Sequence, residues 1–184
     1  MMSFISYFIN GLSLGSVYAI IALGYTMVYG IAKMLNFAHG DVIMIGGYVV
    51  FTVVSTMGLP PAVGILLAVI ICTVLGVTIE KVAYRPLRMA SPLAVLITAI
   101  GVSYLLQNIA LLVFGSNPKS FTSVVTIPAL KLAGGRLTIS GETLVTIVSC
   151  IVIMIVLTTF IKKTRAGQAM LAVSEDKGAA QLMG

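Results

Sequence analysis

The stretch FISYFINGLSLGSVYAIIALGYTMVYGIA, from Phe4 to Ala32, carries no charged residue. A helix needs about 20 apolar residues to cross a bilayer, because the hydrocarbon core is about 30 Å thick and a helix rises about 1.5 Å per residue. The stretch is long enough to span a membrane with some tilt. It lacks the basic start of a cleaved signal peptide, and its apolar run is longer than such peptides have. We expect a spanning helix that stays in the mature protein.

The composition of the whole chain points the same way. Hydrophobic residues make up 59% of it, charged residues only 9%, and the mean hydropathy is +1.14. Soluble domains carry about 25% charged residues, so the chain is expected to be an integral membrane protein. The net charge of +6 is spread over polar connectors without a basic stripe, which argues against nucleic-acid binding. Cys72 and Cys150 lie inside apolar runs, where we expect small hydrophobic residues rather than a disulfide or a metal site.

Four further apolar runs follow the first: Val42–Thr56, Ala62–Ile79, Pro92–Phe114 and Thr143–Ile161. Together they predict an all-α bundle of about five spanning or re-entrant helices, forming a single transmembrane domain over residues 1–184. The third run repeats small residues every four positions (Gly64, Ala68, Cys72, Gly76), a spacing that favours close helix packing in lipid. Val42–Thr56 is short, about 22 Å as a helix.

Three polar segments separate or follow these runs. Glu80–Ser91 is a short basic connector, Gly115–Glu142 is a long, turn-rich and partly β-like loop, and Lys162–Gly184 is a mixed-charge tail. Five alternating helices place the short connector and the tail on one side. The density of charge in the connector favours the cytoplasm for that side, with the N-terminus outside.

The segment KMLNFAHGDV, from Lys33 to Val42, holds the only histidine, His39, and the acidic residue Asp41. One interpretation is an ordinary cytoplasmic turn, with Asp41 as the N-cap of the second helix. The other is a break within the bilayer, since the run that follows is too short to cross alone. Such a break would turn a helix N-terminus toward a passing carboxylate. A metal site is not expected, because one histidine and one aspartate are too few ligands.

The tail, KKTRAGQAMLAVSEDKGAAQLMG, combines small residues with charge. Gly167 to Val173 can form a helical turn or two, and Ser174 is a candidate N-cap for a second short helix favoured by Glu175 and Asp176. A solvated surface needs no stripe of small residues, whereas a helix that seats in a groove of a partner does. We therefore expect the tail to be a docking element.

The stretch TRAGQAMLAVSEDKGAAQLMG resembles the cytoplasmic coupling loop of ATP-binding-cassette importer permeases, and more narrowly the branched-chain amino acid permease family. GLSLGSVYAIIALGYTMVYGIAKMLNFAHGDVIMIGGY and EKVAYRPLRMASPLAVLITAIGVSYLLQN share the resemblance, which covers essentially the whole chain. Family members continue with further helices beyond this loop, whereas this chain stops at Gly184. We therefore expect a C-terminally truncated form.

The resemblance implies an inner-membrane permease that pairs with a second homologous permease, two cytoplasmic ATPase subunits and a soluble binding protein. No cofactor is implied. The residues it assigns to ATPase coupling are Thr164, Gly167, Ala169, Ala172, Glu175, Asp176, Ala179, Ala180 and Gly184. The candidate pathway residues are Asn36, His39, Gly40, Asp41, Gln107 and Asn108. For Gln107 and Asn108, hydrogen bonding between helices is the commoner role. The outer loop Gly115–Glu142 is either a docking surface for the binding protein or a solvated loop.

Other function classes find less support. The apolar runs contain no charged residue, so an ion-coupled secondary transporter or channel would depend on Asp41, Glu80 or backbone carbonyls. An enzyme is not expected, because the chain has no phosphate-binding loop, no nucleophile elbow and no paired carboxylates at catalytic spacing. The sequence leaves the substrate open among branched-chain amino acids, other amino acids, urea and small amides.

Overall fold

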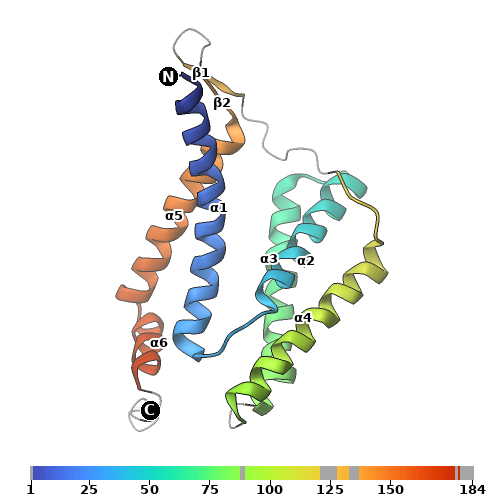
Figure 1. Ribbon diagram of the computed structural model, residues 1–184, viewed down its shortest axis with the longest axis vertical. Coiled ribbons are helices and arrows are strands. Elements are labelled where there is room, and N and C mark those ends of the chain that lie inside the picture. Colours follow the sequence, from blue (N-terminus) through green and yellow to red (C-terminus); the bar gives the residue numbers. More distant parts are fainter. Residues whose placement is uncertain (1, 88–89, 121–127, 133–136, 177, 179–184) are drawn as a thin grey trace. The chain divides into compact units, whose positions relative to one another are not determined.

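A computed structural model of the chain describes residues 2–87, 90–120, 128–132, 137–176 and 178 (Figure 1). Its helices are α1 (Met2–Ala32), α2 (His39–Phe51), α3 (Pro61–Ile79), α4 (Pro92–Phe114), α5 (Gly141–Lys163) and α6 (Arg165–Glu175). Two π-helical turns, η1 (Thr52–Thr56) and η2 (Glu80–Tyr84), and the 3-10 turn η3 (Arg85–Leu87) extend α2 and α3. The all-α polytopic class predicted from the sequence is confirmed.

Five helical segments in the described part of the chain are long and apolar enough to cross a membrane: Phe4–Ile31, His39–Thr56, Pro61–Leu87, Pro92–Phe114 and Gly141–Lys163. Each contains or overlaps one of the predicted apolar runs. The chain is therefore a multi-pass membrane protein.

The second span differs from its prediction. The uncharged run starts at Val42, but the helix starts at His39 and, with η1, reaches Thr56, giving a segment of 18 residues. The argument that this segment is too short to cross alone is therefore wrong. A search for uncharged residues ends at the first charge, whereas the helix continues through Asp41.

The connector predicted after the third span is helical at its start. Glu80 to Tyr84 continue α3, since no helix-breaking residue occurs before Pro86, and Pro86 lies in the closing 3-10 turn. Tyr84 in η2 is 7% exposed, so this turn is anchored by packing. The next helix, α4, begins after Ser91, whose side chain accepts a hydrogen bond from Ala94 N, with Pro92 at the first helical position.

The predicted β-like character of the loop Gly115–Glu142 is confirmed in part. Strands β1 (Leu130–Leu132) and β2 (Leu137–Ile139) pair antiparallel, with Leu130 opposite Ile139. This hairpin leads into α5, whose N-cap Ser140 accepts a hydrogen bond from Thr143 N at 3.2 Å. At the end of α4, Gly115 has φ +78°, a conformation that glycine adopts without strain.

The chain divides into two compact units. Unit 1 comprises Met1–Lys33 and Ser123–Gly184, and unit 2 comprises Met34–Thr122. In unit 1, α1 contacts α5 and α6, and in unit 2, α2 contacts both α3 and α4 (Figure 1). The single transmembrane domain expected from the sequence stays a prediction.

Unit 2 packs through the small residues of its second and third helices. Gly64 is buried, and a Cβ added there would lie 3.6 Å from Val50 Cα. A Cβ added to Gly46 would lie 3.0 Å from Cys72 Sγ, and that thiol donates a 3.4 Å hydrogen bond to Val42 O. In the small-residue stripe predicted for the third helix, Gly64 and Cys72 therefore pack closely against α2. Gly76 of the same stripe faces open space.

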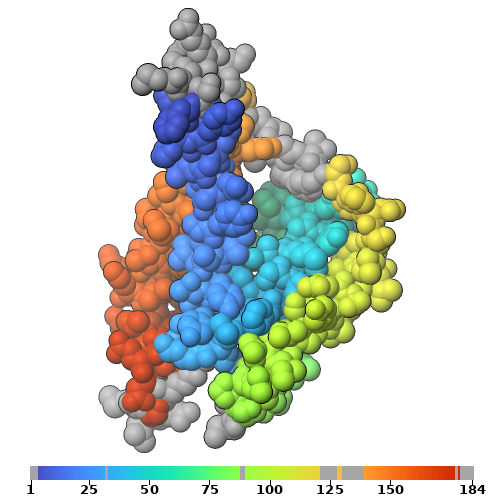
Figure 2. Space-filling model, in the orientation of Figure 1, coloured from blue at the N-terminus to red at the C-terminus, as the bar shows by residue number. Residues whose placement is uncertain are grey.

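Most large apolar side chains point outward. Leu112 is 84% exposed and Phe4 73%, and α1 (blue in Figure 2) presents its side chains along its visible length. Such surfaces are rare on soluble proteins and ordinary where lipid or other helices cover them.

Candidate functional site

A hydrogen-bonded group of three polar side chains connects α2 and α4. Asp41 Oδ2 accepts a hydrogen bond from the Ser103 hydroxyl, and Asp41 Oδ1 accepts one from Gln107 Nε2 at 3.0 Å. Gln107 Nε2 also donates to Ser103 Oγ at 3.2 Å, which closes the group. We call these three residues the Asp41 network. It lies entirely within unit 2.

Local structure explains how the network forms. Ser103 and Gln107 are four residues apart on α4, so they share one face of that helix. Asp41 lies in the first turn of α2, where the helix dipole favours negative charge. The residue is 8% exposed, while Gln107 is exposed. A carboxylate is thus held inside a membrane segment by two neutral donors and a helix terminus.

Asp41 is not the N-cap of α2, contrary to one of the two sequence interpretations. The N-cap is Ala38, whose O accepts from Val42 N at 3.0 Å and whose side chain makes no capping bond. Because Ala38 already has helical backbone angles, the helix starts at His39 and places Asp41 inside its first turn. There the carboxylate turns to α4 rather than to the helix backbone.

A second polar contact lies beside the start of α2. The Tyr84 hydroxyl donates a 2.8 Å hydrogen bond to Asn36 Oδ1, tying the end of the third span to the segment before α2. Asn108, in contrast, donates to Tyr104 O of its own helix at 2.7 Å. His39 and Gly40 open α2, and a Cβ added to Gly40 would meet open space.

The structure therefore brings together two of the six candidate pathway residues, Asp41 and Gln107, and shows Asn36 bonded to Tyr84. The sequence did not single out Ser103 and Tyr84. The four-residue spacing between Ser103 and Gln107 is the sequence signal that points to Ser103. Nothing in the local sequence identifies Tyr84 as a partner for Asn36, 48 residues away.

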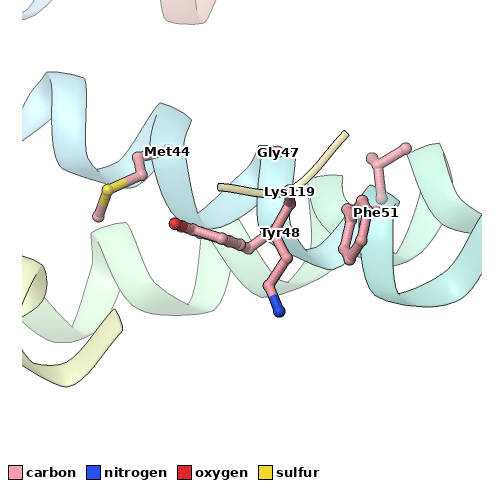
Figure 3. A pocket seen from close by; sticks show the side chains of 6 residues that line it. Met44, Gly47, Tyr48, Phe51 and Lys119 are labelled. Atoms are coloured by element: carbon pink, nitrogen blue, oxygen red, sulfur yellow. The ribbon is translucent and has the colours of Figure 1, made fainter. Parts of the chain in front are cut away.

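A hollow of about 570 Å³ lies further along α2 in unit 2 (Figure 3). Its lining residues are Met44, Gly47, Tyr48, Val50, Phe51 and Lys119. Tyr48 stacks on Phe114 at the end of α4, with ring centroids 4.3 Å apart and planes 5° apart. The lining is apolar apart from the Tyr48 hydroxyl and the Lys119 ammonium group.

The tail forms a short helix bent back at the end of α5. Thr164 is the N-cap of α6, and its Oγ1 accepts a 3.0 Å hydrogen bond from Gly167 N. Gly167 is buried, and a Cβ added there would overlap backbone atoms of Phe160 and Ile161. These two predicted coupling residues thus build the corner between α5 and α6.

The opposite face of α6 is uncovered. Ala169, Ala172 and Asp176 recur at spacings of three and four, so they lie on one side of the helix, with Glu175 at its edge, and all four are exposed. We call these four residues the α6 outer face. Ala179, Ala180 and Gly184 lie outside the described residues.

Ser174 is not the N-cap of a second helix. It lies inside α6, where its hydroxyl donates to Leu171 O. Asp176 is the C-cap of α6, and its Oδ1 accepts a 2.8 Å hydrogen bond from Gly178 N, as a capping residue does. The polar corner therefore lies two residues later than predicted, because the small residues up to Val173 do not stop α6.

Comparison with known proteins places these features in a family. The model of the family described as "Branched-chain amino acid transport system / permease component" matches residues 7–184. The high-affinity branched-chain amino acid transport system permease protein LivH of Salmonella typhimurium is 40% identical over 98% of this chain and 62% of its own length. BraD of Pseudomonas aeruginosa, with the same description, is 41% identical over 96% of this chain and 61% of its own length.

A more distant relative is the probable branched-chain amino acid transport permease protein LivH of Methanocaldococcus jannaschii. It is 27% identical over 90% of this chain and 53% of its own length. The chain thus spans less than two thirds of the length of these relatives, and no solved structure matches it. The family match covers nearly the entire chain, so the chain belongs to the family of permease components of branched-chain amino acid transport systems.

Proposed function

We propose that this chain is the membrane-spanning part of a permease subunit of an ATP-driven importer. It translocates branched-chain or related amino acids across the cell inner membrane after a soluble binding protein delivers them. The single observation that carries the proposal is α6, a capped helix fixed to the end of a spanning helix with a small-residue face exposed. The family membership and the printed descriptions of the relatives support the substrate class.

The tail would face the cytoplasm and contact an ATP-binding-cassette ATPase subunit. The α6 outer face would seat on that subunit, because small residues allow close backbone approach. The corner at Thr164 and Gly167 would carry the displacement into α5, since a close backbone contact leaves little room for α6 to move alone. ATP hydrolysis would occur in the ATPase subunit, and this chain would contribute motion rather than catalysis.

The remaining partners follow from the same proposal. A second homologous permease would cover part of the exposed apolar surface, and lipid would cover the rest. The outer loop, with its β1–β2 hairpin, would meet the binding protein. The pathway would pass the start of α2, with Asn36, His39, Gly40 and Asp41, and would include Gln107 and Asn108 of α4, of which Gln107 contacts Asp41.

A charged substitution on the α6 outer face tests the coupling proposal. We expect Ala172→Arg to lower co-purification of the chain with its ATPase subunits at least tenfold, because a long cation replaces a methyl group at the contact. Ala90→Arg makes the same change at an exposed position of the short connector, which we also place in the cytoplasm, and should leave co-purification unchanged. Equal co-purification of both variants with the wild type would refute the proposed contact, provided that both elute as monodisperse proteins.

Asp41 favours a second candidate, an ion-coupled transporter, because ion-coupled carriers place carboxylates inside their spans. The two candidates differ in their energy source. Uptake by cells that express the chain with its partner subunits should stop on ATP depletion and persist when an ionophore collapses the ion gradients. The reverse pattern would establish the second candidate.

A further inference from the structure

We propose that the Asp41 network is a binding subsite for the ammonium group of the transported amino acid. This inference rests on the proposed function, which gives the chain an amino acid as its cargo. It assigns a specific role to side chains that otherwise only connect two helices.

The charge of Asp41 is the first reason. The side chain is 8% exposed within a membrane segment, and no ion pair to it is present among the residues that the structure describes. An asparagine would accept comparable hydrogen bonds from Ser103 and Gln107 at a lower desolvation cost. A latch between helices therefore does not require the charge, whereas a cationic ligand does.

The acceptor atoms are the second reason. An ammonium group has three N–H donors, and the network offers three kinds of oxygen: the Asp41 carboxylate, the Ser103 hydroxyl and the Gln107 carboxamide oxygen. Gln107 turns its NH₂ group toward Asp41 and Ser103 in the structure. Rotation of the exposed carboxamide presents its oxygen instead, so the same residue satisfies the carboxylate in the absence of ligand and helps to hold the ammonium group in its presence.

The apolar neighbourhood is the third reason. Met44, Tyr48 and Phe51 follow Asp41 along one side of α2 at helical spacings and line the hollow. An aliphatic side chain attached to the same carbon as the ammonium group would extend along α2 toward this hollow, whose lining side chains Figure 3 shows. Its volume of about 570 Å³ exceeds that of one branched side chain, so the subsite would recognise the ammonium group and tolerate different aliphatic groups.

Lys119 does not bind the carboxylate of the same ligand in this arrangement. It lines the hollow beside Tyr48, and Tyr48 lies seven residues and about 10 Å along the axis of α2 from Asp41 (Figure 3). The two charged groups of an α-amino acid are attached to one carbon and do not reach both side chains at once. Recognition by the network should therefore require the ammonium group and be indifferent to the carboxylate.

Three probes that share the side chain of leucine test this inference with the full 184-residue chain in lipid nanodiscs. The probes are leucine, 3-methylbutylamine, which lacks the carboxylate, and 4-methylpentanoate, which lacks the amino group. We expect leucine and the amine to bind with similar affinity in titration calorimetry, and the acid to bind at least tenfold more weakly. Equal binding of all three, or binding of the acid alone, would overturn the subsite, as would the absence of leucine and amine binding.

Matched variants identify the residues. Asp41→Asn should weaken amine binding at least tenfold while the helical signal in circular dichroism stays unchanged. Ser103→Ala removes one acceptor, should weaken binding several-fold, and covers the case in which Asp41→Asn does not fold. Thr98→Val is the control, because the Thr98 hydroxyl donates to Ala94 O of its own helix and lies outside the network. Wild-type affinity in both network variants would overturn the assignment.

Failure of this subsite is distinguishable from failure of the proposed function. The ATPase co-purification test with Ala172→Arg does not involve the network. If Ala172→Arg and Ala90→Arg both co-purify with the ATPase subunits as the wild type does, while the amine still binds, the importer proposal alone is refuted. If Ala172→Arg lowers co-purification with the ATPase subunits as expected, while Asp41→Asn binds the amine with wild-type affinity, the subsite alone is refuted.

Discussion

Replacing Gly167 with alanine would test whether the corner between α5 and α6 is held by close backbone contact. The added methyl group would overlap backbone atoms of Phe160 and Ile161, which cannot rotate away as a side chain does. Overpacking of a filled site typically costs about 1–3 kcal/mol, and fixed backbone neighbours favour the upper part of that range. Alanine recovers about 1 kcal/mol because it is the better helix former. We therefore expect Gly167→Ala to destabilise the docked position of α6 by about 1–2 kcal/mol.

A difference of about 1.4 kcal/mol corresponds to a tenfold change in an equilibrium, so undocked α6 should become about tenfold more populated. Limited digestion with trypsin reports this change, because Lys162, Lys163 and Arg165 lie at the corner. We expect cleavage there to accelerate about tenfold in Gly167→Ala. The control is Gly76→Ala in α3, where a Cβ meets open space and cleavage at the corner should keep its wild-type rate.

Wild-type cleavage kinetics in Gly167→Ala, together with an unchanged thermal midpoint in detergent, would refute the close-contact account of this corner. Faster cleavage in both glycine variants would also contradict it, because the cause would then be a general loss of stability. A rate increase confined to Gly167→Ala is the result that the geometry requires.

Three further predictions concern single contacts, each measured as the free energy of unfolding by circular dichroism in mixed micelles. Tyr84→Phe removes the hydrogen bond to Asn36 and should lower that free energy by about 1 kcal/mol, with Tyr104→Phe, an exposed tyrosine, as a near-neutral control. Gly46→Ala brings a methyl group within 3.0 Å of Cys72 Sγ and should lower the free energy of unfolding. Adding Cys72→Ala to the same chain should recover most of that loss. Additive effects of the two substitutions would contradict the contact. Ser140→Ala removes the N-cap of α5 and should cost about 1 kcal/mol, and a change within error would show that the cap is dispensable.

The spans could be predicted from sequence because their cause is local. A membrane segment needs about 20 consecutive apolar residues, and this requirement is visible in the residues themselves. Helix starts at Ser91, Ser140 and Thr164 follow from capping chemistry of the same local kind.

The candidate site was harder to predict because its parts are distant in sequence. Asp41 meets Gln107 66 residues further along the chain, and no local pattern shows that a partner on α4 stabilises the carboxylate. A scan for uncharged residues therefore started the second span at Val42 instead of His39. The close backbone approach at Gly167 was hidden for a similar reason, because the atoms that it contacts belong to residues of the preceding helix, α5.

The contacts between α2 and α4 repeat at a fixed interval. Asp41 pairs with Gln107, and seven residues later on each helix Tyr48 stacks on Phe114. Sliding one helix along the other by a single residue would break the Asp41–Gln107 hydrogen bond and the aromatic stack together. These two helices are therefore expected to move together as one rigid body.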